Sequence, residues 1–353
     1  MMILADIGGT NMRLAVVQDQ HANATLEKIE IVSCQSFPTI EEVLTRYLSR
    51  HNIRPHSLVL AVAADMQGDD VTITNNSWRF QGISAARACG VSRYMLINDF
   101  CAQALAHADL LMPRRMPAEA AGPDEIVIQQ SGQQSGHPSG QQSGHPSGRH
   151  IIRAGTVRPQ TPLLVSGPGT GLGVAALVPV GDDVTVIEGE GGHVSFAARN
   201  ATEREILHAL QKRWGHVSAE RVVSGPGLET IYHIMTGKGG RTAAEIGSAA
   251  VAGPGADRQA VDVLLTAFAT VLANAALSFG AGAGIVIAGG IVPKLGALLP
   301  QSGFFDRLGD HGRRSGFLNA LPLYLAVDPY AGCHGAFVAA NTANLAHRWC
   351  GVR

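Results

Sequence analysis

Residues 2–17, MILADIGGTNMRLAVV, place a Gly-Gly pair between two largely apolar runs. Such a run that stops at two glycines is typical of a buried strand followed by a tight turn. The stretch therefore predicts a strand over residues 2–7, a turn at Gly8 and Gly9, and a second strand over residues 12–17.

A second glycine-rich stretch, GPGTGLG at residues 167–173, lies between predicted strands at 163–165 and 174–178. Short apolar runs predict further strands at 58–63, 94–97 and 284–288. Helical spacing of apolar residues predicts helices at 40–49, 102–107, 203–214 and 261–279. Thr202 is the expected N-cap of the helix over 203–214. Strands and helices alternate in both halves of the chain, which predicts the α/β class.

Composition excludes several classes of protein. The chain has 353 residues, of which 46% are apolar and 42 are glycine, so neither general disorder nor collagen fits. At roughly 150 residues per domain this length suggests two domains. The 27 Lys and Arg balance 28 Asp and Glu without a basic block, so nucleic acid is not an expected partner. The 5 scattered cysteines contain no C-x-x-C pair, which argues for a reducing cytosol and against a zinc site.

Neither a signal peptide nor a membrane span is expected. No basic segment precedes an apolar stretch at the N-terminus, which predicts a cytoplasmic protein. No charged residue occurs between Asp262 and Lys294, a length that could cross a bilayer. Glycines between residues 280 and 290 interrupt this stretch, however, and favour a buried helix followed by a buried strand.

Residues 129–150 form a low-complexity insert in which the octapeptide QQSGHPSG occurs twice. The insert holds almost no residue that could bury apolar surface and so offset the entropy cost of ordering. We expect a flexible surface loop. Its three histidines are not held at metal-binding spacing, so no metal site is predicted there.

The two glycine stretches are candidate phosphate sites. Neither a G-x-x-x-x-G-K-[ST] nor a G-x-G-x-x-G pattern occurs, so a P-loop and a Rossmann dinucleotide site are not supported. Glycines nevertheless let main-chain N–H groups approach an anion, and Thr10 and Thr170 add hydroxyl donors.

Polar side chains elsewhere complete a possible site. Asn98 and Asp99 end an apolar strand, where the side chains of α/β sheets meet ligands. Glu190 and His193 lie on a glycine loop, and Glu220 precedes a Gly-Pro-Gly turn. Each of these residues alone is more often structural, but the combination is informative.

The ordered set of motifs resembles the bacterial glucokinases, ATP-dependent enzymes of the actin/hexokinase (ribonuclease H-like) superfold. The motifs run in family order from residue 4 to 294: LADIGGTNMRLA, TNNSW, LINDFCAQALA, GPGTGLGVA, EGEGGHVSFA, HVSAERVVSGPGLETIY and IVIAGGIVPK. The Cys-rich zinc motif of the ROK sugar kinases is absent from the sequence, so the resemblance is to the other glucokinase branch.

The resemblance implies a role for each matched residue. Asp99 matches the catalytic base for the 6-hydroxyl of glucose. The residues matched to the other sugar hydroxyls are Asn98, Glu190, His193 and Glu220, with Asn76 nearby. The residues matched to ATP are Ala5, Asp6, Ile7, Gly8, Gly9, Thr10 and Asn11 in the first loop, Gly167, Gly169, Thr170 and Gly171 in the second, and Gly289 and Gly290 near the adenosine.

The resemblance also implies a two-lobed fold with ATP and glucose in a cleft between domains. Residues 1–109 with a final helix over about 329–353 would form a small domain, and residues 110–328 a large one. Mg²⁺ would accompany ATP, with Asp6 as the candidate that holds it through water, and no residue is assigned as a direct metal ligand.

Two other readings remain open at the sequence level. The protein could phosphorylate another hexose or an amino sugar, or it could be a non-catalytic sugar sensor on the same fold. Retention of Asp99 and of both glycine stretches argues against the sensor. The oligomeric state is also open, with a homodimer as the candidate assembly.

Overall fold

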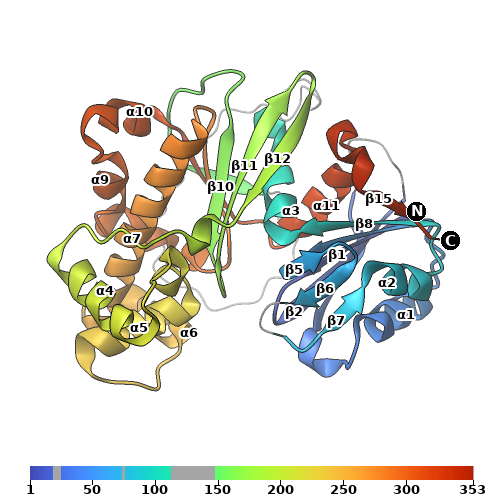
Figure 1. Ribbon diagram of the computed structural model, residues 1–353, viewed down its shortest axis with the longest axis horizontal. Coiled ribbons are helices and arrows are strands. Elements are labelled where there is room, and N and C mark those ends of the chain that lie inside the picture. The colour runs from blue at the N-terminus through green and yellow to red at the C-terminus, as the bar shows by residue number, and fades with distance from the viewer. Residues whose placement is uncertain (19–24, 74–75, 113–147, 353) are drawn as a thin grey trace. The chain divides into compact units, whose positions relative to one another are not determined.

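A computed structural model of the chain describes residues 1–18, 25–73, 76–112 and 148–352. The chain divides into two compact units (Figure 1). The first unit contains Met1–Pro117, Leu177–Glu188 and Asp328–Arg353, and the second contains Ala118–Ala176 and Gly189–Val327.

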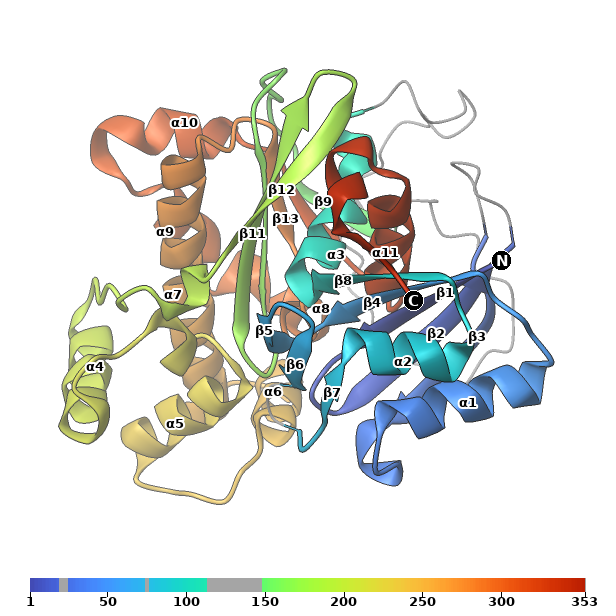
Figure 2. The same ribbon diagram turned by 45° about the vertical axis from the view of Figure 1, so that its right-hand side comes forward.

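A six-stranded sheet with the order β15-β8-β4-β1-β2-β3 forms the centre of the first unit. Its strands are β1 (Met2–Ile7), β2 (Asn11–Val17), β3 (Glu27–Ser33), β4 (Ser57–Val62), β8 (Arg93–Asn98) and β15 (Trp349–Gly351). β1, β4 and β8 run parallel, whereas β2, β3 and β15 pair antiparallel with their neighbours. β1 and β4 are buried along their whole length, because they lie at the centre of the sheet and helices cover both of its faces (Figure 2).

Helices cover both faces of this sheet (Figure 2). Because side chains alternate along a strand, Ile3, Ala5 and Ile7 of β1 share one face, where they join an apolar cluster with α1 (Ile40–His51) and α2 (Gly82–Cys89). The opposite face carries Asp6 and is covered by α11 (Ala331–Asn341), which packs against α3 (Asp99–Leu105). A small antiparallel sheet consists of β5 (Ala64–Gln67), β6 (Asp70–Ile73) and β7 (Arg79–Gln81).

A second six-stranded sheet has the order β12-β11-β10-β13-β14-β9. Its strands are β9 (Arg149–Arg153), β10 (Leu163–Pro168), β11 (Leu172–Val180), β12 (Asp183–Gly189), β13 (Gly284–Ile287) and β14 (Leu323–Ala326). β10, β13 and β14 run parallel, and β9 pairs antiparallel with β14. Both large sheets share one plan. Read from β3, the first sheet has the order β3-β2-β1-β4-β8-β15, which matches β12-β11-β10-β13-β14-β9 in the second. In each sheet, three strands in reverse chain order are followed by two further strands and an added edge strand.

The helices of the second unit gather around α7 (Ala256–Phe279), which lies against β10 (Figure 1). The others are α4 (Ala201–Trp214), α5 (Gly225–Thr236), α6 (Ala243–Ala252), α8 (Val292–Leu295), α9 (Phe304–Gly309) and α10 (Ser315–Ala320). Gly280 ends α7 in the left-handed conformation at φ 64°, which glycine adopts without steric cost. Within the described residues, α7 is the one helix long and apolar enough to cross a membrane, and 67% of its most apolar window is buried inside the protein. A mostly buried helix of this kind is typical of a protein core.

The α/β class is confirmed, and most predicted elements are present with boundaries shifted by a few residues. Two local predictions are wrong. Asn200, not Thr202, caps α4, because its side chain accepts from the Glu203 N–H. The final segment is a helix only over Ala331–Asn341, after which the chain forms a short 3₁₀ segment and β15.

The predicted flexible insert lies outside the described residues except at its end. Residues 149 and 150 form the start of β9 and pair with Ala326 and Leu325 of β14.

Candidate active site

The first glycine turn (residues 8–11) joins β1 to β2 and is fixed by two backbone hydrogen bonds. The Gly8 N–H donates to Asn11 O at 3.0 Å, and the Cys34 N–H donates to Thr10 O at 2.9 Å. Gly9 is partly accessible and Thr10 is exposed, so this part of the turn can meet a ligand. The side chains of Ala5 and Ile7, also matched to ATP, are fully buried in the apolar cluster below the turn.

Asp6 is the buried carboxylate next to this turn. It lies directly opposite Arg13 in the β1–β2 register, with Arg13 Nη1 3.3 Å from Asp6 Oδ2. On the other side α11 approaches so closely that a Cβ added to Gly332 would lie 2.5 Å from Asp6 Oδ2. Burial raises the pKa of the Asp6 carboxyl above its ordinary value, and the Arg13 guanidinium opposes that rise. Arg13 thus belongs to this site, although the sequence motif that contains it predicted no role for it.

Asn98 and Asp99 lie where β8 passes into α3. Asn98 caps the helix, because its Oδ1 accepts from the N–H of Phe100 at 2.8 Å and of Cys101 at 3.3 Å. Its amide nitrogen is therefore the group that can donate to a ligand. Asp99 Oδ1 accepts from the Phe100 N–H at 2.9 Å, and the residue is partly exposed. The cap fixes the backbone that presents the Asp99 carboxylate.

Asn76 lies in the first unit, close to Trp78 and Cys34. Its Oδ1 accepts from the Trp78 N–H at 2.5 Å, and its side chain neighbours the Cys34 thiol. Burial raises the pKa of that thiol, and the Asn76 amide opposes the rise. Since Cys34 also contacts the first glycine turn, Asn76 is linked to the turn through Cys34.

The second glycine loop (residues 167–173) joins β10 to β11 and meets two segments that are distant in sequence. The Gly225 N–H donates to Gly169 O at 2.9 Å, and the Ile291 N–H donates to Pro168 O at 3.3 Å. Gly289 has φ 80°, and a Cβ there would lie 2.6 Å from Pro168 O, so glycine is required for this approach. The structure therefore joins the second glycine loop to the predicted adenosine turn at Gly289 and Gly290.

Glu190 and His193 lie on the segment after β12. Glu190 precedes a 3₁₀ turn over Gly191–His193, with its Oε2 4.0 Å from His193 Nδ1. Both side chains are open to solvent, 85% and 63% exposed respectively. This separation and exposure leave both groups available for hydrogen bonds to a polar ligand.

Glu220 belongs to the same unit and is tied to that segment. It lies in a 3₁₀ turn over Ala219–Arg221, and the Ala219 N–H donates to Val194 O at 2.8 Å. The Leu172 N–H donates to Glu220 Oε2 at 2.8 Å, which brings the carboxylate onto the second glycine loop. The predicted sugar residues of the second unit and its predicted phosphate loop are thus parts of one hydrogen-bonded structure.

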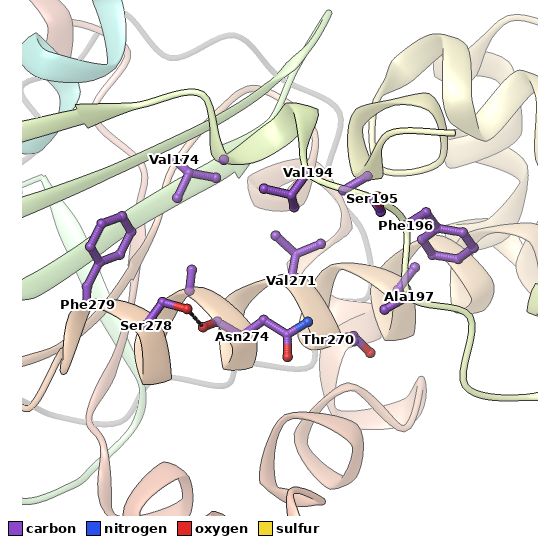
Figure 3. A pocket seen from close by; sticks show the side chains of 14 residues that line it. Val174, Val194, Ser195, Phe196, Ala197, Thr270, Val271, Asn274, Ser278 and Phe279 are labelled. Atoms are coloured by element: carbon purple, nitrogen blue, oxygen red, sulfur yellow. Dashed lines mark hydrogen bonds between the residues drawn. The ribbon is translucent and has the colours of Figure 1, made fainter. Parts of the chain in front are cut away.

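An apolar pocket of about 160 Å³ lies between α7 and the segment 194–197 (Figure 3). Val174, Val194, Val271 and Phe279 line it, with Asn274 and Ser278 on the helical side. It contains none of the carboxylates predicted to bind substrate, and its apolar lining does not suit a sugar. Within the described residues, no group of three or more His, Cys, Asp or Glu could hold a metal ion.

Comparisons with known proteins identify the family of the chain. The family model described as Glucokinase matches residues 3–121 and 144–343. The chain belongs to the glucokinase family. A glucokinase from Chromobacterium violaceum is 35% identical over 97% of this chain and 89% of its own length. A glucokinase from Chromohalobacter salexigens is 34% identical over 97% and 98%, respectively.

A solved glucokinase structure shares the fold. The crystal structure of a glucokinase from an Antarctic psychrotroph has a TM-score of 0.73 and 27% identity, with 96% of this chain and 97% of that chain covered. The plan of the two large sheets is therefore that of a glucokinase. The glycine turns and the Asn98–Asp99 pair lie within the segments that match the glucokinase family model.

Proposed function

We propose that this glucokinase-family protein transfers the γ-phosphoryl group of ATP to the 6-hydroxyl of D-glucose and releases glucose 6-phosphate and ADP. The observation that carries the proposal is the Asn98–Asp99 junction, where a capped helix start presents a partly exposed carboxylate. Relatives named glucokinase at 35% and 34% identity over nearly the whole chain support it.

Asp99 is the proposed general base. Its carboxylate accepts the proton of the 6-hydroxyl as that oxygen bonds to the γ-phosphorus, and the bond from phosphorus to the ADP oxygen breaks in line. Asn98 donates from its amide nitrogen to a sugar oxygen. Glu190, His193 and Glu220 hydrogen-bond the remaining hydroxyls, so an epimer would leave a polar group unpaired.

The two glycine segments are the proposed phosphate sites. Amide and hydroxyl donors of residues 8–11 and of Gly167, Gly169, Thr170 and Gly171 would hold the phosphate oxygens. Gly289 and Gly290 would border the adenosine. Their side-chain-free backbones allow close approach of the nucleotide.

The residues present fit a magnesium ion that arrives with ATP. Mg²⁺ in phosphoryl-transfer sites is usually held by one or two carboxylates together with substrate phosphates and water. Asp6, a single buried carboxylate beside the first glycine turn, is the residue that would hold the ion through water. The ion would supply neutralisation of the phosphate charge.

A coupled assay tests the proposal. We expect ATP-dependent phosphorylation of glucose to exceed that of mannose, fructose and N-acetylglucosamine. Preference for another of these sugars would identify a different hexose or amino-sugar kinase. Binding of glucose without turnover would identify a sensor.

Replacement of the base gives a sharper test. Asp99→Asn should lower kcat by about 10²- to 10⁴-fold, because an amide cannot accept the proton, while the KM for ATP stays nearly unchanged. Asp70→Asn, at an exposed carboxylate of β6, is the matched control and should retain activity. Near-normal turnover of the Asp99 variant would refute the assignment.

The proposal also places the protein in the cytoplasm. Its five cysteines are free, which fits a reducing compartment. The homodimer stays a prediction, which light scattering during gel filtration would test.

A further inference from the structure

Glu220 is anchored independently of its carboxylate. Ser218 and Ser195 form an antiparallel bridge, and the Phe196 N–H donates to Val217 O at 2.9 Å. With the bond from the Ala219 N–H to Val194 O, this short ladder fixes the backbone of the turn that carries Glu220. The carboxylate therefore starts from a defined backbone position.

From that position the carboxylate reaches the second glycine loop. Its Oε2 accepts from the Leu172 N–H at 2.8 Å, across 48 positions of sequence. The absence of a side chain on Gly171 makes the approach possible, since a Cβ there would lie 2.5 Å from the same oxygen. One carboxylate oxygen is thus committed to the loop, and Oε1 is the oxygen left for a ligand.

A bond from an amide to a charged carboxylate is about twice as strong as one between neutral groups. Gly169 is held separately, because its carbonyl accepts from the Gly225 N–H. The contact with Glu220 acts at the other end of the loop, at the first residue of β11. The Gly169 N–H also donates to Gly171 O at 2.8 Å, so loss of the Glu220 contact would leave this turn closed but would remove a hydrogen bond that fixes its Leu172 end.

We propose that Glu220 is a positioning residue for the second glycine loop, so that one carboxylate both binds the sugar and sets the shape of the nucleotide loop. The inference rests on the proposed function, in which that loop holds phosphate. It adds that nucleotide affinity depends on Glu220 even when no sugar is present. A residue that only contacts sugar would have no such effect.

Nucleotide binding without sugar tests the proposal. The full chain is titrated calorimetrically with the magnesium complex of a non-hydrolysable ATP analogue. Glu220→Ala should weaken binding about tenfold, because the Leu172 N–H loses a charged acceptor. Glu220→Gln should stay within about threefold of the parent, since its amide oxygen still accepts from that N–H. Equal affinity in the parent and the Ala variant would overturn the proposal.

The matched control is Glu229→Ala. The exposed Glu229 carboxylate also accepts from a backbone N–H, that of Ala243 at 2.9 Å, but this contact lies between α5 and the start of α6. We expect the control to bind nucleotide like the parent. A tenfold loss in the control as well would show a general effect of removing such carboxylates and would overturn the specific role of Glu220.

Gly171→Ala provides a second, independent variant that keeps the carboxylate. The added methyl group displaces the flexible end of Glu220, which costs less than a backbone shift, and breaks the bond to Leu172. Alone it should weaken nucleotide binding severalfold, and in the Glu220→Ala background the further loss should be smaller than the loss it causes alone, because part of its effect acts through Glu220. Additive losses would overturn the proposal.

These results separate the inference from the proposed function. A parent protein that phosphorylates glucose, with nucleotide affinity insensitive to Glu220, overturns the inference alone. A parent protein that binds no nucleotide overturns both.

Discussion

Asp6 occupies a setting that disfavours its charge. The residue is 6% exposed, and the backbone of α11 at Gly332 lies against its carboxyl group. Burial raises its pKa from the ordinary value of 3.8, so on acidification it becomes protonated before an ordinary aspartate would. Arg13, its partner in the strand register, opposes this shift. Asp6 is proposed to be ionised when it meets the magnesium nucleotide. Its ionisation therefore depends on Arg13.

We predict that Arg13→Met moves the acidic limb of the pH profile of kcat/KM for ATP to higher pH. Without the guanidinium, desolvation acts unopposed, the pKa of Asp6 rises further, and the ionised form is lost at a less acidic pH. The measurement is the initial rate as a function of ATP concentration, at saturating glucose, over a series of pH values from acidic to neutral.

Arg50→Met is the matched control for this prediction. Arg50 Nη1 lies 3.4 Å from Glu30 Oε1, but the Arg50 side chain is 64% exposed and such surface pairs contribute little. The control should keep the parent profile. An unchanged acidic limb in the Arg13 variant would show that Arg13 does not maintain the charge of Asp6.

Among the elements, β1 could be predicted to the residue and the start of α4 could not. The strand ends where two glycines follow an apolar run, so its limits are local. Thr202 was the predicted N-cap of α4, whereas Asn200 caps it, and the position of this cap depends on Glu203. The Glu203 carboxylate accepts a hydrogen bond from the Arg199 N–H at 2.6 Å. It also forms an ion pair with Arg307, which is 104 positions away in the sequence. Local sequence does not contain this distant partner.

The contact between α3 and α11 depends on the absence of a side chain at Gly335. A Cβ added to Gly335 would overlap the backbone carbonyl of Ala102, which cannot move aside as a side chain can. Gly335→Ala should therefore push the two helices apart and lower the free energy of unfolding by about 1–3 kcal/mol. The measurement is the midpoint of urea unfolding.

Gly316→Ala, in α10, controls for helix propensity. No heavy atom lies within 4 Å of the position of its added Cβ, so the substitution should raise stability by up to about 1 kcal/mol. If the Gly335 variant were equally stable, the close packing of α3 on α11 would not matter energetically.

For the whole molecule, the sequence predicted which segments carry polar chemistry but not how they are joined. The two glycine segments and the Asn98–Asp99 pair are local patterns that a single sequence reveals. The bond from Leu172 to Glu220 and the packing of Gly332 on Asp6 depend on tertiary folding over 48 and more than 300 positions. Arg13 was visible in its motif, but only the strand register identified its partner. Long-range pairings are therefore where the structure adds most to the proposed site.

The predicted limits of the insert and the observed fold disagree at one end. The low-complexity insert was predicted to extend to residue 150, yet β9 begins at Arg149 and the Val327 N–H donates to Gly148 O at 2.8 Å. Deletion of residues 129–147 should therefore leave kcat within about a factor of two and the unfolding midpoint unchanged, since shortening a loop alters closure entropy only slightly.

Deletion of residues 129–150 is the matched comparison. It also removes the two β9 residues that pair with Ala326 and Leu325, so the edge of the second sheet loses backbone hydrogen bonds and the unfolding midpoint should fall. Collapse of turnover in the shorter deletion would refute the interpretation of the repeat as a dispensable loop. Equal stability of the two deletions would show that the start of β9 contributes nothing to the sheet. Within the described residues, the fold thus resumes at residue 148, where the Gly148 carbonyl accepts from the Val327 N–H just before β9 begins.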